Sequence, residues 1–267
     1  AIAPLPLRWI ATDQAILRHA LEAEGRTLTA RDLYTPHRVE VPGGAFAVFF
    51  RDTGLSDRIG FVYADWEDAD RAAEDFAERI RALPAEEGRD DCVTIALDGE
   101  NAWGYYADGG RPFLRALYRR LAGTPGLRMG TFSQVLEEAG GVSRLPALRA
   151  IGTGSWIHGS LGTWAAHPEQ REAWRLLADA RARCPAPSRG LDLLHQAEGS
   201  DGFWWMGNEH PTPHKGTFAR LFASAVRMYS RERTSSRLAR VMRAITASGM
   251  SASASAGRTR CRSASRN

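Results

Sequence analysis

The chain has little lysine, few cysteines and no long apolar run. Lys215 is the only lysine among 35 basic residues, which we interpret as a coding bias rather than a functional signal. Three cysteines, Cys92, Cys184 and Cys261, lie far apart without a Cys-x-x-Cys motif, so neither a disulfide framework nor a structural zinc site is indicated. This usage is typical of a reducing compartment and predicts a cytoplasmic protein.

Several motifs of membrane insertion and catalysis are also missing. No run of eighteen apolar residues exists, so no membrane span is expected. The chain holds neither a Gly-x-Ser-x-Gly nucleophile elbow nor a His-Glu-x-x-His zinc motif. His210 and His214 have the spacing of metal ligands on a helix, but Pro211 and Pro213 disfavour a helix there. We therefore expect no metal and no cofactor.

Charge is unevenly distributed along the chain, whose formal net charge is +4. Ten arginines and one glutamate fall in residues 227–267, so this segment carries +9 and the remainder carries −5. A mildly acidic body does not indicate nucleic-acid binding, and we expect no nucleic-acid partner. Residues 247–267 have low complexity and no apolar periodicity, which predicts a disordered tail. A basic tail that binds nucleic acid is the alternative.

Residues 7–150 alternate between strand-like and helix-like segments. The predicted strands are 8–12, 45–50 and 93–97, and the predicted helices are 13–24, 68–83, 110–121 and 133–139. Asp13 is the predicted N-cap of the first helix. Such alternation indicates a parallel sheet or barrel. From about residue 165 the pattern is mostly helical, and the predicted helices are 169–183, 191–198 and 217–229.

Segment 93–103, VTIALDGENAW, carries the most informative pattern. Its apolar run, 93–97, ends abruptly in Asp98 and Glu100. A buried strand followed by carboxylates is how an α/β barrel presents acid–base groups to a substrate. Trp103 offers a flat apolar face close by, which suits a sugar ring. The alternative is an acidic loop that only caps the next helix.

Five segments, in this order, resemble glycoside hydrolase family 57. They are LRWIATDQAIL (7–17), the strand–loop–strand-like FAVFFRDTGLSDRIGFVY (46–63), ALDGENAWGYYADGGRPFLRALYRRL (96–121), GSWIHGSLGTWAAHPE (154–169) and AEGSDGFWWMGNEH (197–210). The chain departs from the family pattern at Gly104, where the family has Glu in DGENAWEYY, and at Gly202, where it usually has Trp. Five ordered matches are much more specific than any one of them.

The resemblance implies an α/β fold with three parts. Residues 1–150 are expected to form the C-terminal part of a (β/α)7-type barrel, and residues 151–246 a helical region that completes the active-site cleft. Residues 247–267 form the predicted tail. The implied function is a retaining glycosidase or glucanotransferase acting on α-1,4 or α-1,6 linked glucans, as polysaccharide or malto-oligosaccharide. A non-catalytic carbohydrate-binding remnant of such an enzyme is the alternative.

The resemblance also assigns roles to individual residues. Asp98 matches the general acid/base, which requires a pKa raised by burial or by a neighbouring carboxylate. Glu100 is such a neighbour and an expected substrate-binding residue, with a structural salt bridge as the alternative. Asp201 matches a residue that holds substrate hydroxyls. The remaining expected substrate-binding residues are aromatic: Trp103, Trp156, Trp204 and Trp205. Core packing is the alternative for the aromatic run 203–205.

Arg51, Asp52, Ser56 and Asp57 follow a predicted strand, where a barrel places functional groups. Helix capping by Ser56 or Asp57 is the alternative. The family's nucleophilic Glu belongs shortly before the first matching segment, and no acid occurs in residues 1–7. We therefore expect this chain to be the C-terminal part of a larger catalytic unit and to hydrolyse no α-glucan at a useful rate by itself.

Overall fold

The computed structural model describes residues 7–84, 88, 90–99, 101–183 and 194–227. The chain divides into two compact units, unit 1 up to Ser160 and unit 2 from Leu161. The predicted tail, 247–267, lies outside the described residues, and the predicted domain ranges stay predictions. No helix within the described ranges is long and apolar enough to cross a membrane.

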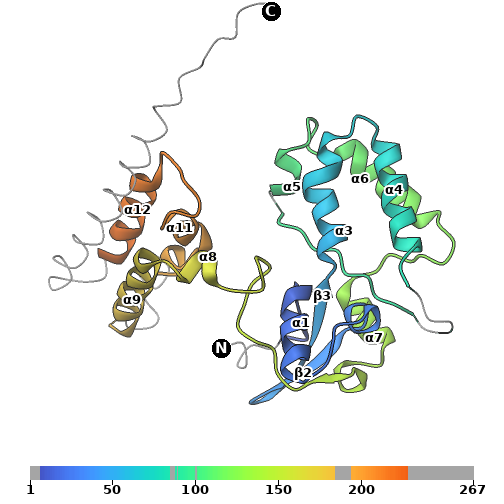
Figure 1. The fold of residues 1–267 in the computed structure, drawn as a ribbon, viewed down its shortest axis with the longest axis horizontal. Coiled ribbons are helices and arrows are strands. Elements are labelled where there is room, and N and C mark those ends of the chain that lie inside the picture. Colours follow the sequence, from blue (N-terminus) through green and yellow to red (C-terminus); the bar gives the residue numbers. More distant parts are fainter. Residues whose placement is uncertain (1–6, 85–87, 89, 100, 184–193, 228–267) are drawn as a thin grey trace, which may run out of the picture. The chain divides into compact units, whose positions relative to one another are not determined.

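Unit 1 is built on a four-stranded sheet with strand order β1-β3-β2-β4. Figure 1 labels two of these strands, β2 and β3. The strands are β1 (Trp9–Asp13), β2 (His37–Val41), β3 (Gly44–Arg51) and β4 (Ala147–Leu148). β1 runs parallel to β3 and β4 parallel to β2, but β2 and β3 form an antiparallel hairpin. The sheet is therefore mixed, and the prediction of a purely parallel sheet is wrong. The (β/α)7 barrel itself stays a prediction.

The central strand, β3, is buried on both faces because its apolar side chains alternate between two clusters. Phe46, Val48 and Phe50 pack with the apolar face of α1 (Gln14–Ala23). Ala47 and Phe49 pack on the other face with residues of α7 (Phe132–Glu138) and the turn after it. The predicted strands at 8–12 and 45–50 are confirmed to within one residue at either end.

The predicted strand at 93–97 is wrong in extent. Only Thr94 forms a bridge, parallel to Arg51. β3 ends at Arg51, and the next residues enter a helix, so no strand backbone remains for Ile95–Leu97 to pair with. The apolar side chains of the segment are nevertheless half-buried against a neighbouring cluster, which explains why the sequence resembles a buried strand.

The strand–loop–strand expected over 46–63 is also wrong in its second half. β3 is followed by α3 (Thr53–Asp57), the π-helix η1 (Arg58–Val62) and the 3-10 turn η2 (Tyr63–Asp65). Leu55, Ile59 and Tyr63 recur at intervals of four residues and are all buried in one cluster with α4 and α6. This packing requires a helix, whereas the β-branched and aromatic residues of the segment favour a strand locally.

Helices complete unit 1. They are α2 (Ala30–Leu33), α4 (Ala69–Arg81), α5 (Asn101–Gly104), α6 (Arg111–Ala122) and the 3-10 turn η3 (Val142–Arg144). Phe76 of α4 packs with Phe113 and Leu117 of α6. The predicted helices at 13–24, 68–83, 110–121 and 133–139 are confirmed, because each has an apolar face at helical spacing.

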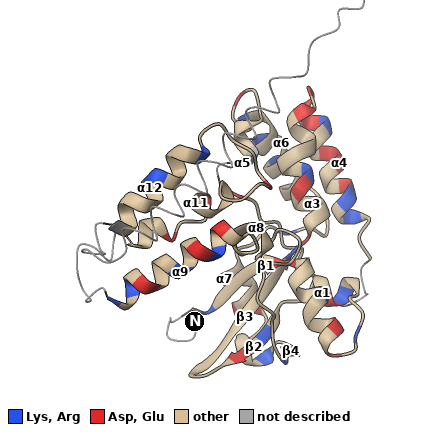
Figure 2. Cartoon of the chain, turned by 60° about the vertical axis from the view of Figure 1, so that its left-hand side comes forward, with Lys and Arg blue, Asp and Glu red and all other residues tan. Residues whose placement is uncertain are grey.

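The described part of unit 2 consists of helices packed around one apolar core. They are α8 (Gly162–Ala165), α9 (Pro168–Ala182), α11 (Ser200–Trp204) and α12 (Lys215–Arg227). Leu176, Phe203 and Phe222 are central members of the core. The predicted helix at 169–183 is confirmed, and the one at 217–229 is confirmed through Arg227; residues 191–193 of the third lie outside the described ranges. Acidic and basic residues are mixed along α4 and α9 (Figure 2).

Candidate active site

At the carboxyl ends of β1 and β3, the buried Arg51 forms ion pairs with two carboxylates. The strands are parallel and pair Asp13 with Arg51 in register, so their last residues share one edge of the sheet. Arg51 Nε lies 3.3 Å from Asp13 Oδ2, and the guanidinium also pairs with Asp57. Thr53 Oγ1 donates to Asp13 Oδ2 at 2.8 Å. Asp13 also caps α1, as predicted, by accepting from Ala15 N.

Asp52 fixes the start of the next helix. Its Oδ1 accepts from Leu55 N at 2.8 Å, so Asp52 is the N-cap of α3, and the alternative role of Ser56 or Asp57 as its cap is wrong. Its Oδ2 accepts from the Tyr34 hydroxyl at 2.8 Å. Burial, together with the Asp52 carboxylate, raises the pKa of Tyr34 far above its usual range, so the phenol remains a donor.

The segment that carries Asp98 is tied to this edge along its backbone. Cys92 N donates to Tyr34 O at 2.8 Å, and Asp52 N donates to Thr94 O at 2.9 Å. Ala96 N donates to the fully buried Ser56 Oγ at 3.3 Å. The chain is therefore held in place up to two residues before Asp98.

Asp98 itself lies half-buried in the turn that follows this segment. Glu100 lies outside the described residues. Cys92, at the start of the segment, is largely enclosed, and burial raises the pKa of its thiol, which keeps it protonated and unreactive. Asp98 therefore follows a backbone that is fixed up to Ala96, and the residue as a whole is only half-buried.

Trp156 lies over the guanidinium of Arg51. The Arg51 Cζ is 5.6 Å from the centre of the indole ring, a cation–π arrangement, and Trp156 is 37% exposed. Its loop packs tightly on α1, since a Cβ on Gly154 would lie 2.3 Å from Ile16 Cδ1. The loop also contains His158 at φ 53°, a backbone conformation that side-chain-bearing residues rarely adopt. The aromatic ring is thus held at the strand ends by both its loop and Arg51.

Trp103 is used mainly for packing. Its ring lies 5.6 Å from that of Tyr106 and belongs to the cluster around α4 and α6. Gly110 faces the same ring so closely that a Cβ there would lie 2.5 Å from Trp103 Cε3. Trp103 is half-buried, so its expected role as a sugar platform stays a prediction.

In unit 2, Asp201 and two tryptophans come from α11 and the residue after it. Phe203, between them, is fully buried and stacks on Trp174 with the ring centres 4.0 Å apart. Trp204 stacks on His210 at 3.8 Å, and Trp205 stacks on Phe218 at 5.6 Å. The run 203–205 therefore divides between the core and two half-buried positions.

A buried ion pair holds the connection from α11 to α12. Lys215 Nζ lies 3.1 Å from Glu169 Oε2 and donates to Gly207 O at 2.6 Å. Glu169 Oε2 also accepts from Gly207 N at 3.0 Å. The single lysine of the chain thus links the start of α9 to the loop after Trp205, which fixes the end of α11.

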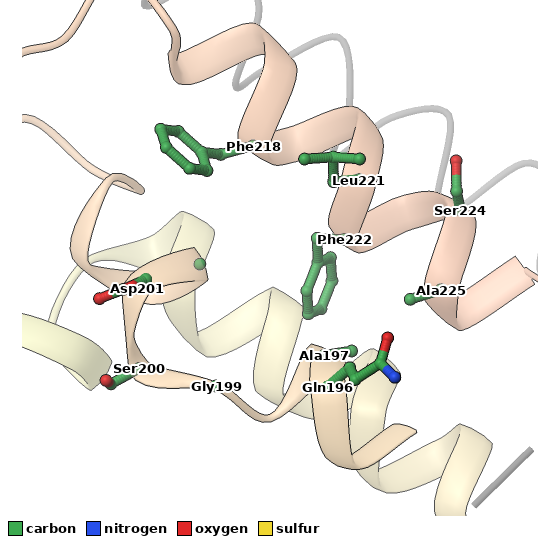
Figure 3. A pocket seen from close by; sticks show the side chains of 11 residues that line it. Gln196, Ala197, Gly199, Ser200, Asp201, Phe218, Leu221, Phe222, Ser224 and Ala225 are labelled. Atoms are coloured by element: carbon green, nitrogen blue, oxygen red, sulfur yellow. The ribbon is translucent and has the colours of Figure 1, made fainter. Parts of the chain in front are cut away.

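Asp201 lies at a pocket of about 650 Å³ within unit 2. Figure 3 shows Phe218, Leu221 and Phe222 lining it from α12, with Ser200 and Asp201 from α11. Asp201 is exposed and is in the first turn of α11. The volume falls within the range of small-ligand pockets, and its lining is mainly apolar with a few polar groups.

The predicted site residues thus fall into two groups. Asp98, Trp103 and Trp156 belong to unit 1, and Asp201, Trp204 and Trp205 to unit 2. The sequence did not indicate that Asp13 would pair with Arg51 or that Tyr34 would bind Asp52, because such contacts join residues far apart in the chain. In the described part of the chain, no three His, Cys, Asp or Glu residues are arranged to hold a metal ion.

Comparisons with known proteins point in one direction. The family described as Glycosyl hydrolase family 57 matches residues 2–147. No curated protein sequence matches the chain. Among solved structures the chain is similar to the 4-alpha-glucanotransferase from Thermococcus litoralis, with a TM-score of 0.59 and 15% identity over 84% of this chain. It is also similar to a branching enzyme from Thermococcus kodakaraensis, with a TM-score of 0.48 and 16% identity over 79% of this chain.

At this identity the similarity to the glucanotransferase concerns the fold. The chain spans 39% of the glucanotransferase and 50% of the branching enzyme. The family match confirms the resemblance for the three segments that lie before residue 148, at 7–17, 46–63 and 96–121.

Proposed function

The chain belongs to glycosyl hydrolase family 57, and we propose that it acts on α-glucans with Asp98 as the general acid/base. The reaction is a retaining hydrolysis or glucan transfer, as the family resemblance implies. The family match and the similarity to a 4-alpha-glucanotransferase support this substrate class.

One observation carries the proposal: Asp98 follows a segment fixed to the carboxyl end of β3. The Thr94 bridge and the bonds to Asp52 and Ser56 hold the backbone, and Asp98 itself is half-buried. General acid/base catalysis needs a group that is positioned by its scaffold and still reaches the substrate. A partly enclosed carboxyl group also suits protonation of a leaving oxygen.

Substrate binding is proposed for the aromatic and polar residues predicted from the sequence. Trp156, held over Arg51, offers a partly exposed ring in unit 1. Asp201 contributes a carboxylate at the pocket of unit 2. Trp204 and Trp205 follow it closely in the sequence and are half-buried. Glucose rings are neutral and present both apolar C–H faces and hydroxyls, so aromatic rings and carboxylates together recognise them.

A retaining mechanism also needs a nucleophilic carboxylate about 5 Å from the acid. Three described carboxylates at this edge, Asp13, Asp52 and Asp57, are poor candidates. Asp13 and Asp52 act as helix caps and are buried, and Arg51 neutralises both Asp13 and Asp57. Structural roles of this kind lower nucleophilicity, so we assign the nucleophile to none of these three.

The test is Asp98→Asn in the full-length protein. We expect turnover of soluble starch and maltoheptaose to fall about 10²–10⁴-fold while binding is largely retained, since the amide keeps the shape but cannot transfer the proton. Reducing-sugar release measures hydrolysis, and chromatography of the oligosaccharides measures transfer. The matched control is Asp70→Asn, an exposed carboxylate of α4 that lies 3.6 Å from Arg119.

Wild-type turnover in Asp98→Asn would show that Asp98 is not the acid. A wild-type protein that binds maltoheptaose without converting it would instead favour the carbohydrate-binding alternative. Equal losses in Asp70→Asn and Asp98→Asn would indicate a general effect of charge rather than catalysis.

A further inference from the structure

Two aromatic side chains of unit 1 are exposed without an evident structural reason. Tyr105 is 70% exposed and follows α5, and Phe61 is 57% exposed in the π-helix η1. Both lie in short uncharged stretches, IGFVYA at 59–64 and WGYYA at 103–107. Exposed apolar side chains that lie together on a surface are typical of interaction sites.

The two stretches lie against each other. Tyr106, the neighbour of Tyr105, donates from its hydroxyl to Ile59 O at 2.7 Å, two residues before Phe61. Burial raises the pKa of Tyr106 to about 12, so this donor stays protonated. α5 and η1 are in contact, and Figure 1 shows α5 beside the helical segment that begins at α3. Phe61 and Tyr105 therefore each lie within two residues of this hydrogen bond, on elements that contact each other.

Packing explains the neighbours of these residues but not the residues themselves. Ile59 and Tyr63 are buried in the cluster with α4 and α6, and so is Tyr106. Phe61 lies between Ile59 and Tyr63 in the chain, but its side chain is exposed and is not part of that cluster. A polar side chain would satisfy the solvent-facing position without exposing an aromatic ring. π-helical turns are also frequent at functional sites.

The surface adjoins the turn that carries Asp98. A Cβ on Gly60 would lie 3.8 Å from Leu97 Cδ2, so the residue before Phe61 faces the side chain of the residue before Asp98. Phe61 therefore lies near the segment that carries Asp98. The absence of charge from both stretches matches a neutral polymer better than an acidic or basic partner.

We propose that Phe61 and Tyr105 form a glucan-binding surface beside Asp98, on which glucose rings of an α-glucan chain stack. The identity of the polymer rests on the function proposed above, whereas the location of the surface rests on exposure and contact alone. Stacking on two rings would hold a longer glucan chain and would favour oligosaccharides over glucose or maltose.

The experiment measures binding of maltoheptaose and maltose by calorimetry in the full-length Asp98→Asn protein, where turnover does not consume the ligand. Phe61→Ala and Tyr105→Ala are each expected to raise the Kd for maltoheptaose by about five- to tenfold, with little change for maltose. Tyr118→Ala is the control, because Tyr118 is also 57% exposed but lies on α6. Tyr105→Phe keeps the ring and is expected to retain binding.

Each outcome decides the proposal. Unchanged maltoheptaose affinity in both alanine variants overturns it, as does an equal loss in Tyr118→Ala or a wild-type protein that binds no maltoheptaose. Light scattering tests whether a second copy of this chain occupies the surface instead. If the alanine variants lose self-association but keep their glucan affinity, the surface joins two copies, and the proposal is wrong. Turnover of the protein without the Asp98→Asn substitution is measured separately. If that protein shows no turnover but the alanine variants lose maltoheptaose affinity, the binding surface is supported and the catalytic role of Asp98 is not.

Discussion

At the scale of single residues, Arg51 organises the strand ends of unit 1. It lies between the buried Asp13 and the more exposed Asp57, with the Trp156 ring over its guanidinium. An isolated buried charge costs several kcal/mol, so each member of such a group depends on the others. Arg51 therefore couples the stability of unit 1 to the position of an expected substrate-binding ring.

Replacing Arg51 tests this coupling. In Arg51→Gln the Asp13 carboxylate stays buried without its cation, and we expect a loss of about 3–5 kcal/mol in the free energy of unfolding. Urea titration followed by circular dichroism measures it. The control, Arg8→Gln, removes an arginine whose pair with Glu137 is mostly exposed, so little change is expected. Equal midpoints for both variants would show that Arg51 is not a stabilising centre.

The chemistry of the site residues could be predicted from the sequence more readily than their contacts. Asp13 was identified as an N-cap, because capping involves neighbours in the chain. Its pairing with Arg51 depends on the register of two strands separated by more than thirty residues. Trp103 is a contrasting example: the sequence indicates a flat ring near Asp98, but only the fold shows that Tyr106 and Gly110 cover part of it.

At the scale of elements, helices with clear caps and one apolar face could be predicted closely. Asp68 accepts from Arg71 N at the start of α4, and Phe76 and Ala77 form part of the buried face. The strand–loop–strand over 46–63 was expected from the family resemblance, and the isoleucine, phenylalanine, valine and tyrosine of its second half also favour extended backbone. Packing of Ile59 and Tyr63 against α4 and α6 overrides that preference. β2 was not predicted, although the alternation of residues in its sequence HRVEV fits a strand with one buried face.

The junction between α5 and α6 offers a test of element packing. Gly110 has φ 72° and faces the Trp103 ring, so Gly110→Ala adds both backbone strain and a clash. Gly109→Ala is the control: its φ is 67°, and a Cβ there meets nothing within 4 Å. We expect Gly109→Ala to cost about 1 kcal/mol from the left-handed backbone, and Gly110→Ala to cost clearly more.

Urea midpoints give the difference between these two variants, and tryptophan fluorescence reports the movement of Trp103. The comparison isolates the ring contact, because both glycines have nearly the same φ. If the two variants unfold at the same urea concentration, Trp103 moves aside at no cost and does not fix the start of α6.

At the scale of the whole molecule, the chain contains separate cores in its two units. Leu136, fully buried, packs with Ala47 and Phe49 of the sheet in unit 1. Leu176, also fully buried, packs with Phe203 and Phe222 in unit 2. The change from β-α alternation to helices near residue 165 indicated a division of this kind, but the family resemblance, rather than periodicity, connected both parts to one substrate.

These two leucines make a matched pair of probes. Each substitution to alanine removes the same atoms from a fully buried site, with an expected loss of about 2–5 kcal/mol in its own core. Hydrogen exchange, followed peptide by peptide, locates the effect. We expect Leu176→Ala to lose protection in α9 and α12 and to keep it in β3, and Leu136→Ala to show the reverse. Since Phe61, Tyr105 and Asp98 all belong to unit 1, Leu176→Ala should also preserve maltoheptaose binding at the Phe61–Tyr105 surface. Loss of protection in both units from either substitution would instead mean that the two cores unfold as one cooperative structure, and that unit 1 requires unit 2 to present its glucan-binding residues.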